Sequence, residues 1–133
     1  MKNFDQLLDS WSPRLLSLLR IVTGFLFIPH GMQKLFGMPG GKEASELFSL
    51  MGFAGSLEFF GGILILLGLF TRLTAFILSG QMAFAYFMAH APKGFLPIIN
   101  NGELAVLYCF AFLYLCAAGP GPWSLDELRR KRL

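Results

Sequence analysis

Charge is scarce in this chain. Asp, Glu, Lys and Arg make up 14% of its 133 residues, whereas soluble globular proteins carry about 25%. His and Cys number two each, and the sequence has no CxxC, HExxH, P-loop or GxGxxG pattern. Two distant histidines without a Glu-x-x-His pair also argue against a di-metal or haem site. Any redox chemistry would therefore rely on a bound organic cofactor or on a partner protein.

The two cysteines are too far apart for a disulfide. Cys109 and Cys116 stand seven residues apart in one expected helix, a rise of about 10 Å, so we expect both to be packing residues. The first 14 residues are polar and contain Asp5 and Asp9, which is unlike a cleaved signal sequence.

Hydrophobic residues, by contrast, make up 55% of the chain, and its mean hydropathy is +0.60. A helix needs about 20 mostly apolar residues to cross the roughly 30 Å hydrocarbon core of a bilayer. Four segments meet this requirement, and Gly and Pro punctuate the stretches after the first, third and fourth. The sequence therefore predicts one all-α domain over 1–133, an integral membrane four-helix bundle with helices near 15–36, 47–70, 73–91 and 102–118.

The basic residues predict the orientation of these helices. Seven Lys and Arg residues fall on one side of the expected bundle and three on the other, and cytoplasmic segments carry the excess. Both termini are therefore expected in the cytoplasm. The net charge of +3 comes largely from the basic run 129–132, which suits anionic lipid headgroups and gives no reason to expect nucleic acid.

Short helices are expected on both flanks of the bundle. Phe4, Leu7, Leu8 and Trp11 have the spacing of an amphipathic helix lying in the headgroup plane. Ser124 and Glu127 have capping-box spacing, which predicts a short basic helix at the carboxyl end.

Several ionisable and polar residues fall inside or close to the predicted spans, where a charge costs about 2.5–3.5 kcal/mol on insertion scales. Counted by depth, most lie in the outer half of the bundle or, for Glu58, near the midplane, whereas Arg20 lies in the inner half. We expect a polar pocket in which Lys34 or His30 faces Glu103 or Glu58. The candidate proton donors and acceptors are Glu58 and His30; the candidate ligand-binding residues are Arg20, Lys34, Gln81, His90, Asn101 and Glu103.

Most of these residues also have a structural interpretation. Lys34, His90 and Glu103 lie within about a turn of a helix end, where side chains reach the interface or cap the helix. Arg20 either extends to cytoplasmic headgroups or forms a buried pair, and Gln81 either bonds two helices together or contacts a ligand. Glu58 is the hardest to explain as structural alone.

The order of short motifs resembles the DoxX family of small bacterial membrane proteins. The matching stretches are Arg20 with Gly24, the segment from His30 to Leu35, Glu58 to Gly62, 67–72, 101–103 and 119–126. One departure from the family pattern is Asn100, which stands where many relatives have Gly in a double-glycine version of the Asn-Gly-Glu element. The resemblance implies a four-helix bundle in the bacterial cytoplasmic membrane and an association with quinone, thiol and sulfur redox metabolism.

These expectations leave three functions open. In the first, the protein is a redox component, such as a subunit of a quinone-linked oxidoreductase, and the pocket binds a quinone or quinol headgroup. In the second, it is a non-catalytic scaffold that holds a soluble oxidoreductase by its basic tail. The third, a small-solute or proton carrier, is disfavoured because the chain has no internal repeat, although a homo-oligomer would supply a second half.

Overall fold

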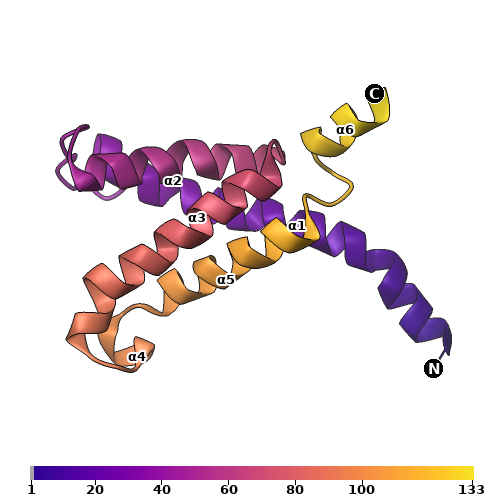
Figure 1. Cartoon of the computed structure of the whole chain (residues 1–133), viewed down its shortest axis with the longest axis horizontal. Helices are drawn as coiled ribbons and strands as arrows, with labels where there is room; N and C mark the ends of the chain where they lie inside the picture. The colour runs from indigo at the N-terminus through magenta and orange to yellow at the C-terminus, as the bar shows by residue number, and fades with distance from the viewer. Residues whose placement is uncertain (1) are drawn as a thin grey trace.

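The computed structural model describes residues 2–133, and that part of the chain is helical without a strand. Successive long helices run in opposite directions (Figure 1). The elements are α1 (Lys2–Phe36), α2 (Leu50–Leu67), α3 (Thr71–Ala85), the π-helix η1 (Tyr86–His90), the 3-10 helix η2 (Ala91–Lys93), α4 (Pro97–Asn100), α5 (Glu103–Ala118) and α6 (Leu125–Arg132).

The helix α1 is longer than expected, because the amphipathic segment near Phe4 to Trp11 continues into the first apolar segment without a break. Pro13 lies inside this helix, where its ring and missing N–H bend a helix rather than always ending it. Figure 1 shows the first turns of α1 leaning away from the rest. The helix therefore begins before the predicted membrane-spanning segment, whose start near Leu15 stays a prediction.

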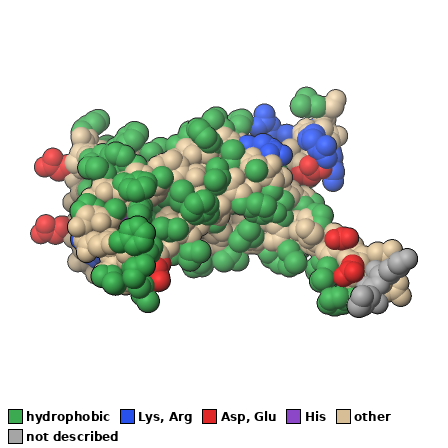
Figure 2. Space-filling model, turned by 60° about the horizontal axis from the view of Figure 1, so that its bottom comes forward, with side chains coloured by type: hydrophobic (Ala, Val, Ile, Leu, Met, Phe, Trp, Pro, Cys, Tyr) green, Lys and Arg blue, Asp and Glu red, His purple; other side chains and the backbone are tan. Residues whose placement is uncertain are grey.

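Three helical stretches are long and apolar enough to cross a membrane: Asn3–Phe36, Leu50–Leu67 and Thr71–Lys93. The helix α5 is apolar but has 16 residues. Large apolar side chains cover the outside of the helices (Figure 2), including Phe25, Phe60, Leu73 and Phe110, each at least 60% exposed. A water-soluble fold would bury such residues, so lipid is the surrounding medium.

The helices pack as two pairs, α1 with α2 and α3 with α5, and the pairs meet mainly through α2 and α3. Glycines let α1 and α2 approach closely: a Cβ added to Gly24 would lie 2.6 Å from the Leu66 nitrogen and 2.9 Å from the Gly62 oxygen. Gly31 and Gly55 meet the opposite backbone or side chains in the same way. Small residues give such contact where lipid removes the hydrophobic drive for packing.

The α2–α3 turn and both termini lie at one end of the molecule (Figure 1). Gly68 ends α2 in the left-handed conformation, with φ 67°. Asp126 then caps α3, because its carboxylate accepts hydrogen bonds from the Phe70 and Thr71 nitrogens at 2.9 Å each. Ser124 accepts from the Glu127 nitrogen at 3.2 Å, so the predicted capped helix at the carboxyl end is confirmed.

Candidate functional site

A cavity of about 280 Å³ lies between the two helix pairs, toward the end of the bundle opposite the termini. All four long helices contribute to it, together with η1 and the residue that ends α4. Its lining residues are Phe27, His30, Lys34, Glu58, Met82, Ala85, His90, Asn101, Leu104, Ala105 and Tyr108. Most of the wall is apolar and a few polar groups converge on it, which is typical of a small-molecule site.

Glu58 is the charged centre of this cavity, with only 2% of its surface exposed. It forms an ion pair with Lys34, whose side chain is 25% exposed. Gln81 donates from Nε2 to the same carboxylate oxygen, Oε1, at 3.0 Å, and also to the Ala54 carbonyl at 3.2 Å. Three helices are thus joined at one carboxylate.

The second oxygen of Glu58 has no such partner. Oε2 is buried and accepts no hydrogen bond from any described residue. A buried polar atom left unpaired costs about 1–3 kcal/mol, and more when it is charged. An ionised carboxylate can only accept hydrogen bonds, so this oxygen suits a ligand group that carries a proton.

An aromatic wall stands beside the carboxylate. Tyr108 packs against Phe27, with ring centroids 4.9 Å apart, and against His30, at 5.8 Å in an edge-to-face arrangement. The His30 ring lines the cavity and packs against Phe27 and Tyr108. An imidazole at this position is suited to proton exchange with a ligand.

The rim of the cavity is organised by Asn100, which was not among the expected site residues. Asn100 is fully buried; its Nδ2 donates to the Tyr86 hydroxyl at 3.1 Å and to the Gly94 carbonyl at 2.9 Å, and its Oδ1 accepts from the Gly102 nitrogen at 2.8 Å. His90 donates from Nδ1 to the Asn100 carbonyl at 3.0 Å. This network holds His90 and Asn101 at the cavity.

Two expected members of the site, Glu103 and Arg20, lie outside the cavity. Glu103 is exposed in the first turn of α5, and Lys34 pairs with Glu58 instead. A carboxylate near the helix amino end needs no side-chain partner there. Of the alternative pairs expected for Lys34, the described residues therefore show the one with Glu58 and not the one with Glu103.

Arg20 is fully buried at the opposite end of the bundle, and its partners are all backbone carbonyls. Its Nη1 donates to Ile65 and Leu66 at 2.7 and 2.6 Å, its Nε donates to Pro120 at 2.8 Å, and its Nη2 donates to Trp123. The first two carbonyls belong to the last turn of α2, where the regular i+4 helical donors are missing. Arg20 is therefore a structural clamp that bonds backbone carbonyls, and it neither extends to the headgroups nor pairs with a carboxylate among the described residues.

The described residues contain no group of three or more His, Cys, Asp and Glu side chains that could hold a metal. The polar groups of the lining residues are one carboxylate, one ammonium group, two imidazoles, the Asn101 amide and the Tyr108 hydroxyl.

These features define a small multi-pass bacterial membrane protein with a polar cavity inside its helices. The DoxX family model matches residues 15–91, and the chain belongs to this family.

Relatives extend the match over most of the chain. An uncharacterized protein of Haemophilus influenzae is 48% identical over 90% of this chain and 94% of its own length. The inner membrane protein YqjF of Escherichia coli is 33% identical over 85% and 90%. CatD of Bacillus subtilis, named as a candidate oxidoreductase, is 28% identical over 82% of each chain. No solved structure matches the chain significantly.

Proposed function

We propose that this protein is a membrane component of quinone-linked or thiol and sulfur redox metabolism, whose cavity binds the headgroup of a quinol or quinone. The observation that carries this proposal is the Glu58 carboxylate, which keeps one buried oxygen unpaired in a cavity that the His30 imidazole also lines. The candidate oxidoreductase among the relatives supports the same class of chemistry.

The size of the cavity fits one substituted ring. An engineered protein cavity of about 150 Å³ holds benzene, and the cavity here has about 280 Å³. The edges and faces of Phe27 and Tyr108 supply a wall for a flat ring. An isoprenoid tail would leave toward the lipid that surrounds the bundle.

The polar groups divide into two roles. Lys34 forms an ion pair with Glu58 and Gln81 fixes the position of the carboxylate, so Oε2 is placed to accept a hydrogen bond from a ring hydroxyl. His30 is placed to take or return the proton, because a histidine changes its charge near neutral pH. A reduced ring, which carries hydroxyl groups, is therefore the preferred ligand.

We propose further that the chain crosses the bilayer four times with both termini in the cytoplasm. The helix α5 rises about 24 Å along its axis, which is less than the roughly 30 Å hydrocarbon core. Its packing beside the longer α3 supports a fourth crossing. The termini and the basic helix α6 share one end of the molecule (Figure 1), and the basic excess favours the cytoplasm. Labelling of single cysteines placed in 37–49 and in α6, from each side of intact cells, tests this orientation.

The decisive experiment is a binding titration in lipid nanodiscs with short-tailed ubiquinol and menaquinol analogues and their oxidised forms. We expect saturable binding that is tighter for the reduced forms and is lost in Glu58→Gln and His30→Ala. Glu103→Gln is the matched control, since it makes the same chemical change outside the cavity. Binding that survives Glu58→Gln, or that Glu103→Gln abolishes equally, would reject the proposal.

A second candidate is a scaffold for a soluble oxidoreductase, favoured by the exposed basic residues of α6. In that case removal of residues 127–133 would release the partner from purified membranes and leave ligand binding unchanged. Copurification of the truncated chain with the same partner would contradict it. Either function is compatible with a homo-oligomer, which crosslinking in the membrane would detect.

A further inference from the structure

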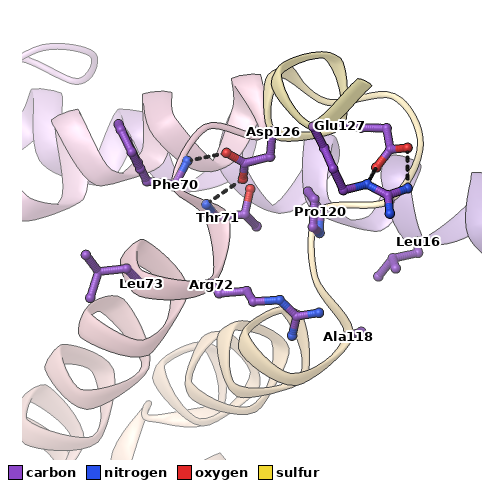
Figure 3. A pocket seen from close by; sticks show the side chains of 11 residues that line it. Leu16, Phe70, Thr71, Arg72, Leu73, Ala118, Pro120, Asp126 and Glu127 are labelled. Carbon is purple, nitrogen blue, oxygen red and sulfur yellow. Dashed lines mark hydrogen bonds and ion pairs between the residues drawn. The ribbon is translucent and has the colours of Figure 1, made fainter. Parts of the chain in front are cut away.

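A second cavity, of about 510 Å³, lies at the end of the bundle that holds the termini (Figure 3). It is bounded by α1, the first turn of α3, the segment after α5, and α6. Its lining combines apolar side chains with two arginines, two carboxylates and a threonine. No residue of the first cavity takes part in it.

One arginine at this cavity is only partly used by the protein. Arg72 donates from Nη1 to the Cys116 and Ala117 carbonyls, at 2.8 and 2.5 Å, and so caps the last turn of α5. Its Nη2 and Nε have no hydrogen-bond partner among residues 2–133. A guanidinium has five N–H donors in a planar fork that matches phosphate oxygens. Arg72 therefore retains donors for an anion.

The other arginine is held by a carboxylate. Arg130 donates from Nε and Nη2 to Glu127, at 3.1 and 2.8 Å, while its side chain stays 78% exposed. This hydrogen bond lowers the pKa of Glu127 below its ordinary value, so Glu127 is charged at neutral pH. Glu127 thus keeps Arg130 at the mouth of the cavity and competes with any anion for it.

The remaining carboxylate does not repel an anion strongly. Asp126 accepts from the two nitrogens at the start of α3 (Figure 3), where the helix dipole offsets its charge. The Thr71 hydroxyl is buried and has no partner among the described residues. It can donate to an additional oxygen.

The apolar part of the lining indicates where such an anion comes from. Leu16, Leu73 and Phe70 face the same cavity, and Leu73 and Phe70 are 65% and 53% exposed on the outside of the bundle. Phosphate donors beside lipid-facing apolar side chains match an amphiphile better than a soluble ion. The charge and the apolar surface are complementary to one phospholipid molecule.

We propose that this cavity is a headgroup site for an anionic phospholipid, whose phosphate is held between Arg72 and Arg130 and whose acyl chains leave along Leu16 and Leu73. The site differs from general attraction between the basic tail and the membrane, because only Arg130 of the four basic residues in α6 lines the cavity. It is also independent of the ligand proposed for the first cavity.

Native mass spectrometry of the full chain, titrated with phosphatidylglycerol in detergent, measures the site directly. We expect one retained lipid, with affinity about fivefold weaker in Arg130→Gln. Arg132→Gln removes the same charge from the same helix outside the cavity and is expected to change little. Glu127→Gln releases Arg130 and is expected to bind the lipid more tightly, an outcome that loss of folding cannot produce.

Two further ligands identify the source of the phosphate. Phosphatidylcholine is expected to be retained less well than phosphatidylglycerol, and glycerol phosphate without acyl chains is expected to bind hardly at all. Equal weakening by Arg130→Gln and Arg132→Gln would show general charge attraction and overturn the proposal. So would weaker binding in Glu127→Gln, or competition by glycerol phosphate at the affinity of the lipid.

Discussion

The two ends of the bundle treat a buried charge in opposite ways. At the end with the termini, Arg20 is fully buried and each of its three nitrogens donates to a backbone carbonyl. Near the other end, Glu58 is almost as buried but has one oxygen without a partner. A buried charge whose hydrogen bonds are all satisfied holds a fold together, whereas one that is left incomplete is available for a ligand.

The largest effect is expected at the saturated end. Arg20→Ala removes a donor from four carbonyls at once and should cost about 3–5 kcal/mol of stability, because each buried acceptor left unpaired costs about 1–3 kcal/mol. Thermal unfolding in detergent measures it, and Arg20→Lys should recover part of the loss. A variant with the unfolding temperature of the wild type would show that the clamp is not structural.

The glycine contact between α1 and α2 runs between the two ends, so its disruption should affect both. Gly24→Ala places a methyl group against the α2 backbone and should cost about 1–3 kcal/mol through overpacking. Gly80→Ala in α3 is the control: no atom lies within 4 Å of its added Cβ, and alanine favours a helix by about 1 kcal/mol. The two unfolding temperatures should move in opposite directions.

The ion pair at the incomplete end should contribute less than the clamp. In a double-mutant cycle of Lys34→Met and Glu58→Gln, we expect a coupling energy of about 1 kcal/mol, within the usual range for residues in contact. Lys34 is partly exposed and can reach solvent when its partner is removed. The same cycle with Glu103→Gln in place of Glu58→Gln should show no coupling. A coupling there would indicate the alternative pair of Lys34 with Glu103.

The smallest effect is expected at the α3 cap. Asp126→Asn keeps one acceptor for the two nitrogens of Phe70 and Thr71, so it should cost about 0.5 kcal/mol, at the low end for helix caps. Asp126→Ala should cost about 1 kcal/mol. Hydrogen exchange of the Phe70 and Thr71 amides reports the change locally. Unchanged protection in Asp126→Ala would mean that the cap is formed by other groups.

Much of the fold could be predicted because lipid imposes simple requirements on a sequence. Long apolar runs and the Gly and Pro residues between them indicate membrane helices, and the capping residue Ser124 marks the start of α6. The continuity of α1 through Pro13 was not predictable, because a proline can bend a helix or end it. The π-helix at Tyr86–His90 has no comparable signal in the sequence.

The candidate site was only partly predictable. The depth of His30, Lys34 and Glu58 along their helices followed from residue counting, and these three residues line one cavity. The partners of Arg20 could not be found, because they are backbone carbonyls 45 to 103 residues away, and any side chain can present a carbonyl. The rotation of α5, which points Glu103 outward, depends on packing that periodicity does not resolve.

The division of the bundle into two pairs also determines what the first cavity can do mechanically. Lys34 and Glu58 belong to the pair that the glycines lock together, while Tyr108, Met82 and His90 belong to the other. The cavity therefore lies between two helix pairs, and a small change in their crossing angle would alter its width without unfolding any helix. The hydrogen bond from Gln81 on α3 to Glu58 on α2 connects the two helix pairs.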